Sequence, residues 1–153
     1  MANANAISSG VVEEEFPNLA ADIVKFPVRS GEDAWTLTEM REIAEALLAE
    51  KIAFEAELVE ADADLTDLLR NSGDGSGDDQ ADYGSSALER EQELTLVNNT
   101  RDLLEQNRQA LARIAAGTFG TCENCGEAVG KARQQAFPRA SLCVSCKQKE
   151  ERR

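Results

Sequence analysis

The sequence predicts a mainly α-helical protein, with a long antiparallel coiled-coil hairpin followed by a small C-terminal module built on four cysteines. Two long stretches repeat apolar residues at helical spacing, a segment rich in Gly, Ser and Asp separates them, and all four cysteines follow the second stretch. Hydrophobic residues make up 42% of the chain but aromatic residues only 5%, which suits helices packed along narrow seams better than a thick core.

The first long helix is expected to begin near Thr36. Thr36 and Glu39 have the spacing of a capping box, and Trp35 and Met40 are placed for a hydrophobic staple. The helix is expected to stop near Asn71, where the glycine-rich segment begins. Its apolar seam advances in steps of three, four or seven residues and consists of Met40, Ile43, Leu47, Phe54, Leu58, Leu65 and Leu69.

Residues 71–86 read as an acidic loop between the two helices. The second helix is expected to start near Ser86, which forms a capping box with Glu89, and to end at Gly117, a residue type common just after a helix. Its seam consists of Ala87, Leu94, Val97, Leu104, Leu111 and Ile114.

Two long helices joined by one loop favour a coiled-coil hairpin over residues 36–117, with the loop as its tip. The alternative is that both helices fold back onto a compact bundle, but each has one narrow seam and a third long helix is missing. Residues 1–35 show no sustained periodicity and are expected to be flexible or weakly ordered, with a short helix near Leu19 to Val24. Residues 118–153 form the third segment, a finger with a short C-terminal helix.

The charge is high and unevenly distributed. The chain carries a net charge of −13; residues 1–117 hold nine basic and 25 acidic residues, whereas residues 118–153 hold seven basic and four acidic ones. Nucleic-acid binders usually present a basic face, so we expect no direct sequence-specific DNA binding. The natural partner is a protein with a basic surface.

The compartment expected from the sequence is the cytoplasm. The N-terminal residues lack the basic and apolar regions of a signal peptide, and no apolar run approaches the length of a membrane span. We therefore expect a monomer that does not associate with membranes. Cytoplasmic thiols stay reduced, so clustered cysteines favour a metal over disulfides.

The four cysteines have the spacing of a zinc site. Two C-x₂-C pairs are separated by 17 residues, an arrangement typical of one structural Zn²⁺ held by four thiolates, and the ligands are Cys122, Cys125, Cys143 and Cys146. Four protein ligands leave no open coordination position, so catalysis by this metal is not expected. A thiol redox switch and a pair of disulfides are the competing interpretations.

The rest of the sequence gives no sign of an enzyme. The chain contains no histidine, no P-loop and no dinucleotide-binding fingerprint. The loop aspartates Asp74, Asp78, Asp79 and Asp82 would, taken alone, read as a solvated turn. Displayed at the end of a long hairpin, they could instead reach into a channel of a partner and act near a metal ion or a basic residue.

The motif G-x-F-G-x-C-x-x-C-G at residues 117–126, the stretch around Ala136 to Pro138 and the preceding hairpin together resemble the DksA/TraR zinc-finger transcription regulators of bacteria. The resemblance covers roughly residues 36–148. It implies a protein that binds RNA polymerase directly and inserts the coiled coil into the secondary channel, so that the tip approaches the active site and alters initiation.

The resemblance also implies roles for individual residues. The family's tip motif, D-x-x-D-x-A, matches Asp79 and Asp82, although Gly84 stands where the motif has alanine. Some members share a ppGpp site with the polymerase, whose basic positions fall on Gln106, Phe137 and Lys147. Only Lys147 keeps a positive charge, which implies weak or absent synergy with ppGpp.

Two other functions stay open at this point. One is a generic zinc-ribbon interaction module that docks onto another basic protein. The other is a polymerase accessory factor of the transcript-cleavage type, in which tip carboxylates recruit Mg²⁺. Factors of that type have a similar hairpin but no zinc finger, so the cysteines argue against it.

Overall fold

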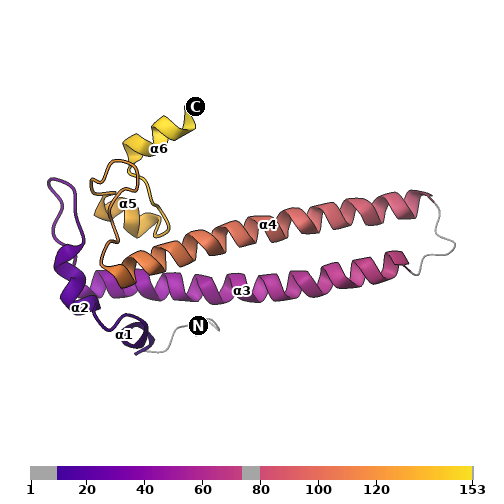
Figure 1. Ribbon diagram of the computed structural model, residues 1–153, viewed down its shortest axis with the longest axis horizontal. Helices are drawn as coiled ribbons and strands as arrows, with labels where there is room; N and C mark the ends of the chain where they lie inside the picture. The colour runs from indigo at the N-terminus through magenta and orange to yellow at the C-terminus, as the bar shows by residue number, and fades with distance from the viewer. Residues whose placement is uncertain (1–9, 74–79, 153) are drawn as a thin grey trace. The chain divides into compact units, whose positions relative to one another are not determined.

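The computed structural model describes residues 10–73 and 80–152, and of residues 71–73 and 80–86 it describes the backbone only. This part of the chain is mainly helical (Figure 1), with the elements α1 (Val11–Glu15), α2 (Leu19–Asp22), η1 (Ile23–Lys25), α3 (Leu37–Gly73), α4 (Gln80–Ala116), α5 (Lys131–Ala136) and α6 (Val144–Glu151). None of these helices is long and apolar enough to cross a bilayer.

The chain divides into two compact units. The base unit consists of Met1–Lys51 and Gln106–Arg153, and the outer hairpin consists of Ile52–Glu105. In each unit a segment of α3 lies antiparallel to a segment of α4 (Figure 1). The predicted mainly helical fold, with a long antiparallel hairpin and a C-terminal cluster of four cysteines, is confirmed.

The predicted capping box at the start of α3 is confirmed. The Thr36 hydroxyl accepts a hydrogen bond from the Glu39 N–H at 3.2 Å, and the Glu39 carboxylate accepts one from the Thr36 N–H at 3.0 Å. These two bonds satisfy donors that have no partner within the helix. They explain why the helix begins directly after Thr36.

The predicted end of α4 at Gly117 is also confirmed. Gly117 has a φ of +77°, a conformation that glycine adopts without strain. Its N–H bonds to the carbonyl of Ile114 at 3.2 Å, and the Thr118 N–H bonds to that of Arg113 at 2.9 Å. This pair of bonds is the Schellman motif, which satisfies the last carbonyls of a helix.

The expected loop at residues 71–86 is too long. Helix α3 continues to Gly73 and α4 already begins at Gln80, so Ser86 lies inside α4 rather than at its N-cap. The prediction rested on the poor helix propensity of Asn, Ser and Gly. A glycine in a helix is less favourable than an alanine by only about 1 kcal/mol, so helix propensity predicts the end of a helix weakly.

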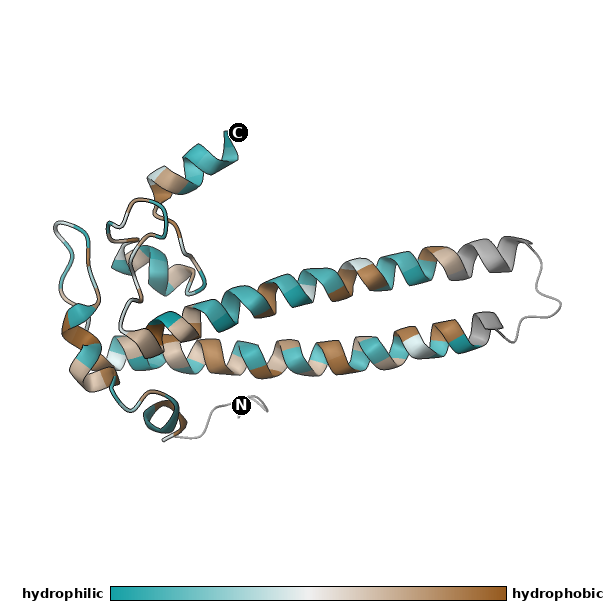
Figure 2. Cartoon of the chain, viewed as in Figure 1, coloured by the Kyte–Doolittle hydropathy of each residue, from teal (hydrophilic) through white to brown (hydrophobic). Residues whose placement is uncertain are grey.

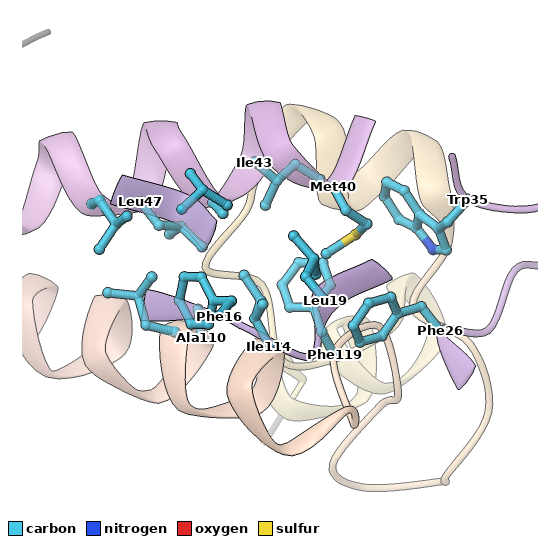
Figure 3. Packing of buried hydrophobic residues seen from close by; sticks show 14 residues of the cluster. Phe16, Leu19, Phe26, Trp35, Met40, Ile43, Leu47, Ala110, Ile114 and Phe119 are labelled. Carbon is cyan, nitrogen blue, oxygen red and sulfur yellow. The ribbon is translucent and has the colours of Figure 1, made fainter. Parts of the chain in front are cut away.

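The core of the protein lies in the base unit. Figure 3 shows side chains of the N-terminal segment, of the start of α3, of the end of α4 and of Phe119 meeting there. The ring of Phe119 is fully buried and packs edge-on against Phe26 and Trp35, with ring centroids 6.2 and 6.3 Å away. Met40 and Leu47 of the predicted α3 seam are likewise fully buried. Phe16, Phe26, Trp35 and Phe119 therefore gather in this core.

Residues 10–35 differ from the expected weak order, because they are packed into this core. Val12, Phe16, Leu19 and Phe26 are all buried within it. Arg41 of α3 forms an ion pair with Glu13 of α1. The short helix expected near Leu19 to Val24 is present as α2 and η1. The apolar residues of this segment show no periodicity because its helices are only a few residues long, and each contributes one or two apolar side chains to the core.

In the outer hairpin, hydrophilic residues predominate on α4, whereas hydrophilic and hydrophobic residues alternate along α3 (Figure 2). Val97 and Leu104 of the predicted seam are buried, whereas Leu69 and Leu94 are 49% and 42% exposed. Leu68 rather than Leu69 is half-buried. A step of seven residues drifts by about 20° on a straight helix, so a seam extrapolated over many turns ends one residue off.

One polar side chain is buried between the two helices of the base unit. Asn107 is fully buried, and its amide donates a hydrogen bond of 2.7 Å to the carbonyl of Leu47. A buried amide of this kind restricts the register in which two helices can pair, because any shift would leave it without a partner.

Candidate metal centre

The first cysteine pair lies in a tight turn directly after the core residue Phe119. An isolated bridge joins Thr121 to Ala128, and the Cys122 N–H donates to the carbonyl of Glu127 at 2.7 Å. Gly126 closes the turn with a φ of +78°, and its N–H bonds to the Cys122 carbonyl at 3.0 Å. The glycine expected after the second cysteine is thus placed where only a residue free to adopt this backbone angle fits.

The second pair lies at the start of α6. Cys143 is the N-cap residue of that helix and Cys146 belongs to its first turn. The Glu123 N–H bonds to the carbonyl of Ser141 at 2.9 Å, and the Asn124 amide donates to the Cys146 sulfur at 3.3 Å. These two contacts join the first turn to the second.

The four sulfurs fit a single tetrahedral metal. They all lie within 4.8 Å of one another, and the Sγ atoms of Cys125 and Cys143 are 3.8 Å apart. A tetrahedron with Zn–S bonds near ~2.3 Å has its sulfurs about 3.8 Å apart. Cys122, Cys143 and Cys146 are buried and Cys125 is exposed. The donor set is therefore that of a closed structural zinc site.

The surroundings of the cysteines favour the thiolate form of Cys122 but not that of Cys125. Burial opposes ionisation of Cys122, but the N–H groups of Cys125, Cys143 and Asn124 outweigh it and lower the pKa of this thiol to about 6. For Cys125, the N–H of Glu127 favours the thiolate, whereas contacts with the other three thiols raise the pKa to about 11. Four neighbouring thiolates need a cation, which a bound Zn²⁺ supplies.

A cleft of about 770 Å³ in the base unit lies beside the finger. Its lining includes Gln106, Phe137 and Lys147, so the structure brings together the three positions singled out by the resemblance to ppGpp-binding regulators. Phe137 is 61% exposed, and the guanidinium of Arg133 lies 5.8 Å from the centre of its ring. The cleft is therefore partly apolar where a phosphate site needs donors.

The cations of the cleft already have partners. Arg139 forms an ion pair of 2.8 Å with Glu50 of α3, and Lys147 one of 3.4 Å with Glu150. The lining contains three basic side chains and four carboxylates. Arg139 and Lys147 thus meet carboxylates, and the lining of the cleft has no surplus of positive charge.

The tip residues fall at the edge of the described chain. Asp79 lies outside the described residues. Asp82 belongs to the first turn of α4, but its side chain is not among those described. Both residues stay candidates on the resemblance alone.

The family model described as "Prokaryotic dksA/traR C4-type zinc finger" matches residues 117–152, the segment that carries all four cysteines. The finger, residues 117–152, is of the DksA/TraR C4 type. The DksA/TraR finger supplies the four ligands of one Zn²⁺, as the spacing predicted.

Individual DksA/TraR relatives extend the likeness beyond the finger. The chain is 40% identical over 75 residues to the RNA polymerase-binding transcription factor DksA of Caulobacter vibrioides, an alignment covering 49% of this chain and 53% of that protein. It is 30% identical over 80 residues to General stress protein 16O of Bacillus subtilis, covering 52% and 49%. The chain thus spans about half the length of the curated relatives it matches.

A solved structure of a DksA protein matches a larger part of this chain. The structure of transcription factor DksA2 from Pseudomonas aeruginosa matches with a TM-score of 0.62 and 28% identity, over 75% of this chain and 84% of that one. The similarity to DksA2 therefore includes the helical hairpin as well as the finger.

The sequence did not reveal how the DksA/TraR finger is attached to the hairpin. Arg113 of α4 forms an ion pair of 3.0 Å with Glu123 in the first cysteine turn. The Glu50 carboxylate accepts from Arg139 of the finger and, at 3.4 Å, from the buried Asn107 amide. These partners lie ten to 89 residues apart in the chain, so no local pattern marks them.

We predict that Cys122→Ser removes stoichiometric zinc and unfolds the DksA/TraR finger. Zinc binding contributes on the order of 10 kcal/mol or more to the folding of small zinc modules, and a hydroxyl does not replace a thiolate. Metal analysis and amide hydrogen exchange should show loss of zinc and of protection at residues 119–146. Ser141→Ala, a change beside the centre that removes no ligand, should bind one zinc. A zinc-loaded Cys122→Ser protein with a protected finger would contradict the assignment.

Proposed function

We propose that this protein binds bacterial RNA polymerase and regulates the initiation of transcription. The observation that carries the proposal is the combination of a DksA/TraR finger with a long helical hairpin, a combination also found in a solved DksA2 structure. A relative of 40% identity is named an RNA polymerase-binding transcription factor. The proposed role is not enzymatic, and the protein acts in the cytoplasm as a monomer, through the polymerase rather than by reading a DNA sequence.

In the proposed mechanism the hairpin enters the secondary channel of the polymerase. The charge of the chain supports this, because it is concentrated in the hairpin. Residues 52–105 hold 15 acidic and three basic residues, a net of −12, whereas the rest of the chain holds 14 acidic and 13 basic residues. A strongly acidic hairpin is attracted to a channel lined with basic residues, and the attraction raises the association rate.

At the end of the hairpin, Asp79 and Asp82 are proposed to act near the polymerase active site. Asp82 lies in the first turn of α4. Carboxylates at a helix N-terminus remain ionised readily, because the helix dipole stabilises negative charge there. They are therefore suited to meet a metal ion or a basic side chain.

The proposal predicts that zinc-loaded protein retains RNA polymerase core in a pull-down, and that the retention falls as salt is raised, because surface charge is screened. Chelated protein should retain less, since the finger no longer supports the base of the hairpin. Retention of some other basic protein, with no affinity for the purified core enzyme, would favour a generic interaction module and refute the proposal.

The tip role has a separate test. The double substitution Asp79→Asn and Asp82→Asn should leave polymerase binding within about twofold, because the hairpin and finger are intact, while abolishing the effect on initiation from a responsive promoter in vitro. Asp62→Asn with Asp64→Asn, on the exposed surface of α3, removes the same charge away from the tip and should preserve the effect. A tip variant that regulates like the native protein would show that the two aspartates are not needed.

We also propose that ppGpp has little or no synergy with this protein. Of the three positions implied by the family, Gln106 and Phe137 carry no charge and Lys147 is paired with Glu150. Calorimetric titration of the polymerase complex should detect no ppGpp binding that depends on this protein. Gln106→Lys with Phe137→Arg restores two cations in the same cleft and should strengthen binding. Tight, protein-dependent binding to the native complex is the result that overturns this expectation.

A further inference from the structure

One carboxylate outside the finger holds the helix that lies between the two cysteine pairs. Glu32 accepts hydrogen bonds from the backbone N–H groups of Lys131 at 2.9 Å and Ala132 at 3.0 Å. These are the first two residues of α5, whose N–H groups have no partner within their own helix. A third bond, from the Arg29 N–H at 2.8 Å, orients the carboxylate itself. Glu32 therefore caps α5 from about a hundred residues away in the sequence.

The side chain of Lys131 strengthens the same contact. Its ammonium forms an ion pair of 2.7 Å with Glu39 and lies 5.7 Å from the centre of the Trp35 ring. It also approaches the carbonyl of Ala34 at 3.3 Å. The hydrogen bond from Lys131 is the main reason that the pKa of Glu39 falls to about 2. The first residue of α5 is thus held through both its backbone and its side chain by residues 32–39.

The close approach depends on a glycine. Gly130, the residue before α5, has a φ of +113°. A Cβ atom there would lie 3.1 Å from the Cδ atom of Arg29, closer than such contacts normally are. Only glycine therefore lets residues 29–32 reach the end of the helix without strain.

On its other side, α5 is tied to the second cysteine pair. The buried amide of Gln134 donates to the carbonyls of Phe137 and Ala140, and the Arg133 Nε donates to that of Leu142 at 3.0 Å. Leu142 directly precedes the ligand Cys143. The position of α5 thus sets where the second pair of thiols lies relative to the first.

We propose that Glu32 is a positioning residue of the zinc centre, which holds the spacer helix α5 so that the two cysteine pairs are aligned for one metal ion. On this proposal the zinc site extends beyond residues 117–152, and residues 26–35 act as a strap that slows the loss of zinc. The proposal concerns zinc retention and does not depend on the binding of RNA polymerase.

The test is the rate at which the zinc-loaded full chain gives up its metal to an excess of a chromogenic chelator. Glu32→Gln keeps the shape of the side chain but not the charged acceptor, and Glu32→Ala removes both. We expect zinc transfer to be about fivefold or more faster in both variants, in line with the loss of a helix cap. Glu32→Asp, which keeps a carboxylate, should fall between Glu32→Gln and the native protein.

The matched control is Glu42→Gln, which removes the same charge from an exposed position on α3. It should release zinc at the native rate, and all variants should keep the native far-ultraviolet circular dichroism of the long helices. A Glu32→Gln protein that releases zinc as slowly as the native chain overturns the proposal. So does an equal acceleration in Glu42→Gln, because the effect would then be one of overall charge.

A measurement on the native protein covers the case in which a Glu32 variant does not fold. In the zinc-loaded chain the amides of Lys131 and Ala132 should be protected from hydrogen exchange, because Glu32 accepts from both. Addition of chelator should remove this protection together with that of the Cys122 amide. Exchange of Lys131 and Ala132 at the rate of an unstructured chain, while Cys122 stays protected, would show that the cap does not exist in solution.

Discussion

The repulsion between four thiolates is the constraint on which the base unit depends. Sulfurs as close as 3.8 Å cannot all be charged unless a cation lies among them. The finger contains one isolated bridge and two short helices, so it has little secondary structure of its own to hold it. Metal binding and folding are consequently one process here.

Around that centre the base unit uses hydrophobic and ionic contacts for different purposes. The rings of Phe26, Trp35 and Phe119 pack edge-on and are buried directly before the first cysteine turn, so apolar burial stabilises the attachment of the finger. The carboxylates of Glu32, Glu50 and Glu123 each meet a donor on a different part of the chain. Half-exposed ion pairs add little stability, but they are directional. They restrict the finger to one orientation on a core that apolar contacts alone would hold less specifically.

The outer hairpin has the opposite character. Few of its large apolar side chains are buried, and nearly all the net charge of the protein lies on it. The charge of this segment suits long-range attraction to a basic partner. The base unit therefore holds the metal-binding residues, and the outer hairpin carries the charge that would attract the polymerase in the proposed function.

The sequence alone determined the features that depend on local spacing. The cysteine ligands, the Thr36–Glu39 capping box, the Gly117 helix end and the buried seam around Met40 and Leu47 all follow from residues a few positions apart or from a regular period. Such patterns can be recognised in a sequence because few backbone conformations are compatible with each of them. The suggestion that the partner is RNA polymerase came from the family resemblance, because a hairpin and a zinc finger do not by themselves identify a binding partner.

Only the tertiary structure decided where α3 and α4 end, that residues 10–35 belong to the core, and which carboxylate holds α5. Helix α3 continues through Asn71 to Gly73 and α4 begins at Gln80, although Asn, Ser and Gly have weak helix propensities. Phe16 and Phe26 lie in turns with no period to mark them as buried. The bond from Lys131 to Glu32 spans 99 residues, and a contact of that range leaves no trace in spacing, because it depends on the path of the whole intervening chain.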